Sequence, residues 1–394
     1  MPGSVIVSTA RTPIGKLQGS LASFGPSDLG GFAIAGALER AGISGEQVDY
    51  AVMGLVVHAG AGQVPGRQAA VKGGIPMSVP SVAINKACLS GLHAIYMADQ
   101  MIQTGDAEIV VAGGMESMTR APYLLKEARA GYRMGNGDLL DSLLADGLFC
   151  AFDAIHMGEG TERYAQAWGG VTRERQDDLA MKSHERAAAA MKAGRLADEI
   201  VSVSVAQRRG DPIVVDTDEG VRPETTMESL AKLRPAFASD GTVTAGNASQ
   251  ISDGAAAVVV MSKEKAEALG LAPLAELLGF GLVAGPDTSL QTQPSRAIRR
   301  ALDKAGTQLT DVDLFEINEA FAAVALTSME DLGIDDDVVN VNGGAIALGH
   351  PVGMSGTRIV GSLVRELRRR GGGTGAAALC GGGGQGEAVV FRTL

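Results

Sequence analysis

The sequence predicts an α/β fold made of two similar halves with an inserted segment between them. Segments typical of strands alternate with segments typical of helices, which favours a mostly parallel sheet with helices on both faces in each half. A repeat relates the halves: residues 37–49 read ALERAGISGEQVD and residues 301–313 read ALDKAGTQLTDVD. In each half, a glycine-rich strand–helix junction and a strand that runs into glycines follow in the same order. We therefore expect a duplicated chain whose halves pack as a pseudo-symmetric pair.

Composition limits the classes of function. Of the 394 residues, 45% are hydrophobic and 20% are charged, as in folded globular proteins. The net charge of −11 argues against a nucleic-acid partner or an anionic membrane surface. The three cysteines (Cys88, Cys150 and Cys380) lack the CxxC spacing of zinc sites, so we expect no metal and no disulfide framework. The chain is expected to be a reduced, cytoplasmic protein.

No targeting or membrane segment is expected. The sequence has no apolar run of 18 residues. A strand at Val5–Val7 leaves no room for a signal peptide, and residues 391–394 do not form the peroxisomal tripeptide.

The first half centres on Cys88. The repeat at 37–49 predicts a helix end followed by a strand over 50–57, and a second β-prone run covers 79–84. An apolar helix follows Cys88 and ends at Gly105. A thiol between a strand and a helix lies near free N–H groups and the positive end of the helix dipole, which favours the thiolate. The alternative is a small buried hydrophobic residue.

The segment 118–250 differs from its flanks and is interpreted as an insertion on the first half. It is richer in charge, and it contains a predicted helix over 173–193. Residues 126–137 form a glycine-broken basic loop, which we interpret as either a subunit contact or a mobile surface loop.

The second half carries three candidate functional positions. Asn318 follows the predicted strand 314–317, where open α/β sheets bind ligands, although it could also cap a helix. His350 lies in the glycine-rich stretch 343–356, as a candidate base or oxyanion donor; a phosphate-binding loop is disfavoured because GKS/T is missing. Cys380 begins CGGGGQG after an apolar strand, either beside an oxyanion hole of glycine N–H groups or in a tight hairpin. We interpret Cys88 and Cys380 as occupying matching sites of the two halves.

These motifs together resemble the thiolase family, most closely its acetoacetyl-CoA-forming members. The resemblance spans the whole chain and rests on ARTPIGK at 10–16, NKACLSGL at 85–92, GGMESM at 113–118, HMGEGTE at 156–162, KLRPAF at 232–237, TAGNAS at 244–249, NEAFA at 318–322, GGAIALGHPVGMSG at 343–356 and CGGGGQG at 380–386. It implies a duplicated five-layer αβαβα architecture with two pseudo-symmetric mixed sheets. The implied parts are an N-terminal half (1–117 and 251–270), an inserted loop domain (118–250) and a C-terminal half (271–394).

The resemblance also implies catalytic roles. Cys88 would be the nucleophile that carries the acyl group, and His350 would take its proton. Cys380 would be the acid/base at the α-carbon of the second acetyl-CoA. Asn318, through a water, and His350 would hold the enolate oxygen, while the N–H groups of Cys88 and Gly382 would hold the tetrahedral oxyanion.

Coenzyme A is implied as substrate and product, with no other cofactor. Arg222 and Ser229 would meet the nucleotide end, Phe237 and Ser249 the pantetheine arm, and Leu148, His156 and Met157 the acyl pocket; Phe321 of the NEAFA motif would join this site. One departure is Leu89, where relatives commonly have Gly or Ala, and it would either narrow the acyl site or pack beneath it.

The expected reaction is the reversible condensation of two acetyl-CoA to acetoacetyl-CoA and CoA by a ping-pong route in fatty acid metabolism, performed by a homotetramer. The alternative is a degradative 3-ketoacyl-CoA thiolase with a longer acyl pocket. A non-catalytic acyl-CoA carrier would be expected to lose one of Cys88, His350 and Cys380, and a decarboxylating ketosynthase would favour a Cys-His-His set.

Overall fold

A computed structural model describes residues 3–165, 168 and 170–394 of the chain. Within these residues the centre is a ten-stranded sheet in the order β14-β15-β16-β13-β1-β12-β5-β3-β4, with β2 attached to β12. Its strands are β1 (Ser4–Arg11), β2 (Gly15–Lys16), β3 (Tyr50–Gly54), β4 (Ser81–Ile84), β5 (Ile109–Ser117), β12 (Ser252–Ser262), β13 (Ala275–Ala284), β14 (Leu314–Ile317), β15 (Thr374–Gly381) and β16 (Gln385–Thr393).

The sheet is mixed rather than mostly parallel. The pairs β3–β4, β3–β5 and β14–β15 are parallel, and the other pairs of this sheet are antiparallel. The prediction of a mostly parallel sheet was therefore wrong. Strand β12 lies antiparallel between β1 and β5, and β16 lies antiparallel between β13 and β15. The two expected sheets also join, through a short pairing of Val5 with Glu276 and Ile6 with Ala275.

Strand order confirms the predicted duplication. Outward from the β1–β13 junction, the first half runs β1-β12-β5-β3-β4 and the second runs β13-β16-β15-β14. A parallel bridge between Phe315 and Val339 takes the place that β4 has in the first half. In each half, therefore, the strands nearest the junction pair antiparallel and the outermost strands pair parallel.

The repeated sequence forms the same local structure twice. Helices α1 (Pro26–Ala41) and α8 (Gln293–Ala305) end at Gly42 and Gly306, whose φ angles of 68° and 63° lie in the left-handed region that favours glycine. The carboxylates of Asp49 and Asp313 then accept the first N–H of β5 at 2.9 Å and of β15 at 2.8 Å. The recurring Asp thus fixes the start of a neighbouring strand in each half.

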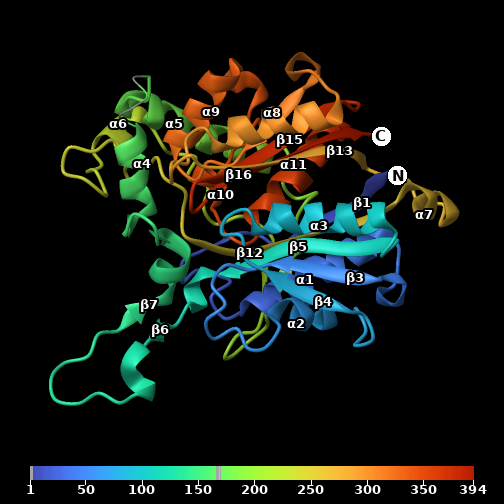
Figure 1. Ribbon diagram of the computed structural model, residues 1–394, viewed down its shortest axis with the longest axis horizontal. Helices are drawn as coiled ribbons and strands as arrows, with labels where there is room; N and C mark the ends of the chain where they lie inside the picture. The colour runs from blue at the N-terminus through green and yellow to red at the C-terminus, as the bar shows by residue number, and fades with distance from the viewer. Residues whose placement is uncertain (1–2, 166–167, 169) are drawn as a thin grey trace.

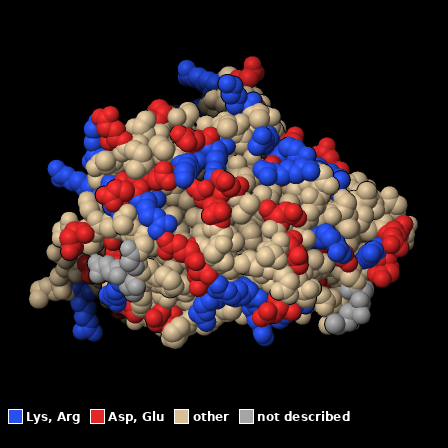
Figure 2. Space-filling model, turned by 90° about the horizontal axis from the view of Figure 1, so that it is seen from above, with Lys and Arg blue, Asp and Glu red and all other residues tan. Residues whose placement is uncertain are grey.

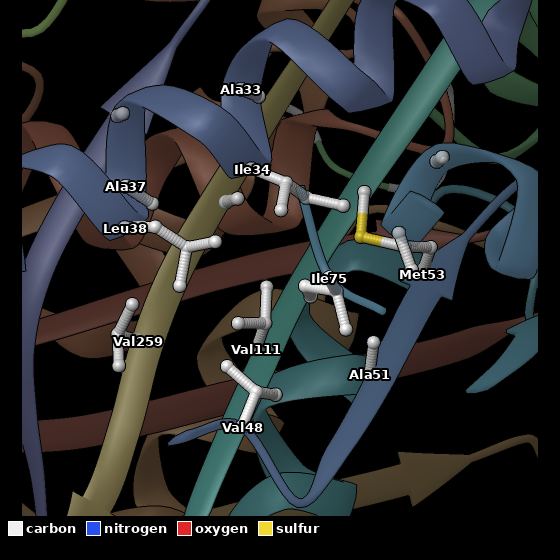
Figure 3. Packing of buried hydrophobic residues seen from close by; sticks show 14 of the residues in the cluster. Ala33, Ile34, Ala37, Leu38, Val48, Ala51, Met53, Ile75, Val111 and Val259 are labelled. Atoms are coloured by element: carbon white, nitrogen blue, oxygen red, sulfur yellow. The ribbon is translucent and has the colours of Figure 1, made fainter. Parts of the chain in front are cut away.

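Helices form three layers around the two halves of the sheet (Figure 1). Helices α1 and α2 (Pro65–Lys72) cover the outer face of the first half, and α8 and α9 (Ala322–Leu332) cover that of the second; α3 (Ser90–Thr104) and α11 (Ser355–Arg369) lie between them. Because neighbouring strand residues face opposite sides, Val110 packs in the middle layer and Val111 packs outward beneath Ile34 and Leu38 of α1 (Figure 3). The result is the five-layer architecture that the resemblance implied.

Between β5 and β12 the chain contributes no strand to the large sheet among the described residues. It forms α4 (Met157–Ala165), α5 (Arg173–Lys192), α6 (Met227–Ala231) and the two-stranded pairs β6 (Tyr123–Leu124) with β7 (Leu140–Asp141), β8 (Phe149–Cys150) with β9 (Ile155–His156), and β10 (Val203–Val205) with β11 (Ile213–Val215). Helix α5 confirms the helix predicted over 173–193. The shorter helices α7 (Lys263–Ala268) and α10 (Ala345–Leu348) lie outside this segment.

The loop 126–137 projects from the body of the molecule (Figure 1). Tyr132 and Met134 on this loop are exposed. Elsewhere, on the face shown in Figure 2, Lys and Arg side chains are intermixed with Asp and Glu. No helix in the described part of the chain has both the length and the apolar character needed to cross a membrane.

Candidate active site

The Cys88 turn joins β4 to α3, as the sequence predicted. Ala87 adopts a left-handed conformation with φ of 50°, which is strained for a residue with a side chain. The Asn85 side chain supports this turn: its Oδ1 accepts the Ala87 N–H at 2.9 Å, and its Nδ2 donates to the Val56 carbonyl at 3.0 Å. The strained backbone is therefore held by a neighbouring loop.

The Cys88 thiol is not biased towards the thiolate in the unliganded site. Burial raises its pKa to about 11, although the backbone N–H groups of Cys88 and Gly382 act in the opposite direction. The side chain keeps some exposed surface. Even so, burial of the sulfur by protein atoms raises the pKa of the thiol more than the N–H groups lower it. The prediction of a thiolate favoured by the helix terminus was wrong, and a base is needed to remove the proton.

His350 has the tautomer that such a base requires. The Ser355 hydroxyl donates to the Pro351 carbonyl at 3.0 Å, so it accepts from His350 Nδ1–H at 2.6 Å. This arrangement assigns the hydrogen to Nδ1 and leaves the Nε2 lone pair unprotonated. Burial, and then the positive charge of Arg358, lower the pKa of His350 to about 3, so the ring is neutral at neutral pH.

Asn318 lies at the end of β14 and is fully buried. Its Nδ2 lies 3.4 Å from His350 Nε2, and its Oδ1 has no hydrogen-bond partner among the described residues. Helix α9 begins only at Ala322, with Phe321 as its N-cap, so the alternative of Asn318 as a helix cap was wrong. The amide is therefore available to the site.

Cys380 lies at the end of β15 and is buried. Burial and the nearby Cys88 raise the pKa of its thiol. The residues after it form the tight β15–β16 hairpin, with Gly383 and Gly384 at φ of 78° and 67°. The predicted tight hairpin is therefore present, and Cys380 also places its thiol near Cys88.

The two thiols do not occupy matching positions of the repeat. Cys380 follows Thr374 by six residues, as Met115 follows Ile109, and Thr374 and Ile109 are the strand-starting residues held by the repeated Asp. The Cys88 turn precedes α3, which corresponds to the turn before α11 that carries His350. The interpretation of two equivalent cysteines was therefore wrong.

Leu89 packs beneath the site and does not narrow it. Its side chain is fully buried in the middle layer, and a Cβ added to Gly381 would lie 2.5 Å from Leu89 Cγ. Leu89 therefore rests against the backbone that follows Cys380. The two thiol-bearing turns touch at this point.

A cavity of about 660 Å³ opens onto His350. Seven of the predicted residues line it, namely Leu148, His156, Met157, Phe237, Ser249, Phe321 and His350. Cys88 packs in a cluster with Leu148 and Val352 on one side, and Cys380 packs in a cluster with Met157 and Phe321 on the other. Neither thiol lines the cavity itself, but each packs, from its own half, in a cluster with residues that do.

Two predicted coenzyme A residues do not line the cavity. Ser229 is exposed and forms the capping box of α6 with Thr226. Arg222 is half-buried, and its backbone N–H donates to His184. Arg222 lies two residues after Gly220, whose carbonyl accepts from the cavity residue Gln250.

Sequence reasoning missed several lining residues. They include Lys16, Leu17, Met118, Leu144 and Gln250. Lys16 ends the ARTPIGK motif, but its place became visible only because β2 pairs with β12. Leu144 belongs to a π-helix, Leu143–Leu148, a form often found at functional sites that has no simple sequence signal.

Family comparisons agree with this architecture. The model of the thiolase N-terminal domain matches residues 4–264, and that of the thiolase C-terminal domain matches residues 271–393. The boundary between them falls between β12 and β13.

Known proteins match over the full length. A probable acetyl-CoA acetyltransferase of Mycolicibacterium smegmatis is 56% identical over 98% of this chain and 100% of its own. The acetyl-CoA acetyltransferase of Pseudomonas aeruginosa is 50% identical over 99% of each chain. The crystal structure of the Bacillus anthracis acetyl-CoA acetyltransferase superposes with a TM-score of 0.97 at 40% identity, over 100% of this chain and 99% of its own. The chain is therefore an acyltransferase that belongs to the thiolase family.

Proposed function

We propose that this enzyme catalyses the reversible condensation of two acetyl-CoA to acetoacetyl-CoA and CoA, through an acetyl group carried on Cys88. The observation that carries the proposal is the unprotonated Nε2 of His350 on the wall of a cavity whose lining residues pack in clusters with a thiol from each half. The names of the full-length relatives support the choice of acetyl-CoA.

In the first half-reaction, His350 Nε2 takes the proton of the Cys88 thiol. The thiolate attacks the thioester carbonyl, and the N–H groups of Cys88 and Gly382 stabilise the oxyanion. Collapse of this intermediate forms the acetyl–Cys88 thioester and expels CoA, which leaves with the proton of the Cys380 thiol. His350 therefore keeps the Cys88 proton on Nε2, and Cys380 is left as a thiolate. The exchange of one thioester for another is nearly balanced in energy.

In the second half-reaction, Cys380 acts as a thiolate base on the α-carbon of another acetyl-CoA. The resulting enolate oxygen is held by His350 Nε2–H and, through a water, by Asn318. The carbanion attacks the acetyl carbonyl on Cys88, a carbon–carbon bond forms, and Cys88 leaves as a thiolate that takes its proton back from His350 Nε2. The raised pKa of Cys380 suits this role, because a thiolate with a higher pKa is a stronger base.

A short acyl group fits the packing around Cys88. The cluster that Cys88 joins contains the buried side chains of Val57, Leu143 and Val352. Such packing close to the sulfur favours acetyl over long acyl chains. The degradative alternative, a 3-ketoacyl-CoA thiolase, would require room for a longer acyl chain in this cluster.

The remaining proposals concern coenzyme A and assembly. Phe237 and Ser249 on the cavity wall would hold the pantetheine arm, while Arg222 and Ser229 would meet the nucleotide end outside it. The exposed Tyr132 and Met134 on the projecting loop support a role for 126–137 in a homotetramer.

Thiolysis of 3-ketoacyl-CoA substrates with four, six, eight and twelve carbons, at fixed CoA, tests the chain length. We expect activity with four carbons and a steep loss beyond it. Activity that holds or rises with length would establish the degradative alternative. No activity at any length would instead point to a non-catalytic acyl-CoA carrier.

A further inference from the structure

Glu116 is a buried carboxylate that contacts two separate loops. It lies near the end of β5 and is fully buried. Its Oε2 accepts the N–H of Val56 at 2.9 Å and of Gly353 at 3.0 Å, and its Oε1 accepts the N–H of Val57 at 3.1 Å. A side chain with two acceptor oxygens and no donor is suited to three converging N–H groups.

One of these loops leads to the nucleophile. The Val56 carbonyl accepts from Asn85, and Asn85 in turn accepts from the Ala87 N–H. Ala87 is the strained residue immediately before Cys88. A continuous series of hydrogen bonds therefore runs from Glu116 to the Cys88 turn.

The other loop leads to the base. Gly353 lies in the turn between His350 and α11, and the Pro351 carbonyl in the same turn fixes Ser355 against the imidazole. A Cβ on Gly353 would lie 2.8 Å from Glu116 Oε2, so glycine lets this turn sit directly on the carboxylate.

We infer that Glu116 is a positioning residue that sets the distance between the Cys88 thiol and His350 Nε2. The inference rests on the proposed function of these two groups. Glu116 touches neither reacting atom and acts through the two turns that it holds. Its N–H partners also oppose the burial that raises the pKa of Glu116 to about 7, so they favour its charged form.

The test replaces Glu116 by Gln, which keeps the shape but presents an amide N–H₂ group to a backbone N–H. Asp49→Asn is the matched control, because Asp49 accepts backbone N–H groups at the opposite end of the same strand. The readouts are kcat and KM for acetoacetyl-CoA thiolysis, and the rate at which iodoacetamide alkylates Cys88 at pH 7, followed by mass spectrometry of the Cys88 peptide.

We expect Glu116→Gln to lower kcat by about ten- to a hundredfold, since a misplacement of about 1 Å can cost that much. KM should stay within about twofold, alkylation should slow in parallel, and Asp49→Asn should change neither. The negative charge of Glu116 also raises the pKa of Cys88, so faster alkylation in Glu116→Gln would mean that charge, not position, is its role and would overturn the inference. An unchanged kcat would overturn it as well.

A second variant keeps the test decisive if Glu116→Gln does not fold. Asn85→Ala removes the link between Val56 and Ala87 from an exposed position. It should lower kcat in the same sense, and no effect would count against the inference. Wild-type protein without thiolase activity, but with alkylation that depends on Glu116, would remove the proposed function and leave the positioning role intact.

Discussion

Replacement of His350 should show how weakly the Cys88 thiol ionises when no base is present. In the folded chain the pKa of Cys88 is about 11, against an ordinary value of 9.0. At pH 7 these values leave roughly one thiol in 10,000 ionised, compared with roughly one in 100 for an ordinary cysteine. Without a base, Cys88 should therefore react about a hundredfold more slowly than a free cysteine.

We expect wild-type Cys88 to alkylate with iodoacetamide at pH 7 faster than this unassisted rate, because His350 Nε2 takes its proton as the sulfur attacks. The variant His350→Gln should be at least about a hundredfold slower than wild type. Its rate should then rise about tenfold per pH unit between pH 7 and 10, following the thiolate fraction. Quantifying the modified Cys88 peptide separates this thiol from Cys150 and Cys380.

The control is His156→Gln, which removes an imidazole from the wall of the same cavity and leaves the Nδ1–Ser355 contact in place. This variant should alkylate at the wild-type rate. If His350→Gln also kept the wild-type rate at pH 7, His350 would not be the base, and the tautomer argument would fail.

Other perturbations give distinct outcomes. Cys380→Ala should still form acetyl–Cys88 from acetyl-CoA but should lose condensation; retained condensation would require another base. Leu89→Ala should lower the free energy of unfolding by about 2–4 kcal/mol in urea titrations, because it empties a buried site, and a changed chain-length preference would contradict its place beneath the cavity. Replacing residues 126–137 by a short Gly-Ser linker should convert tetramers to smaller species in sedimentation velocity, and intact tetramers would exclude this loop as the contact. Folding lowers the pKa of His350 from 6.5 to about 3, so below about pH 6.5 the unfolded chain binds a proton that the folded chain does not. Between pH 7 and 5, wild type should therefore lose about 2 kcal/mol more of its free energy of unfolding than His350→Gln loses. Equal losses in urea titrations would refute this linkage.

Features set by local sequence could be predicted from the chain alone. The glycine that ends α1, the length of α5 and the bounds of β14 follow from capping residues and periodicity, which act over a few residues. The position of Asn318 at a strand end follows from β14 in the same way. The thiols, imidazole and amide of the site could be proposed from motifs. The structure places the imidazole on the cavity wall, the amide beside it, and each thiol in a cluster with other lining residues.

Features set by distant partners could not be predicted. The antiparallel place of β12 depends on β1 and β5, which precede it by more than a hundred residues. Lys16 reaches the cavity wall only through that same strand. The pKa of Cys88 depends on how deeply residues of both halves bury its sulfur. The sequence near residue 88 does not indicate that burial.

Duplication has let the two copies of one motif diverge in purpose. In the repeat, Met115 and Glu116 of the first half stand where Cys380 and Gly381 stand in the second. One copy ends its strand in a reactive thiol and a bare backbone, while the other ends it in a thioether and a carboxylate that ties loops together. A single-copy ancestor would have had to meet both demands with one set of residues. The doubled chain assigns reactivity to one strand end and rigidity to the other, so a change that improves either need not compromise its counterpart.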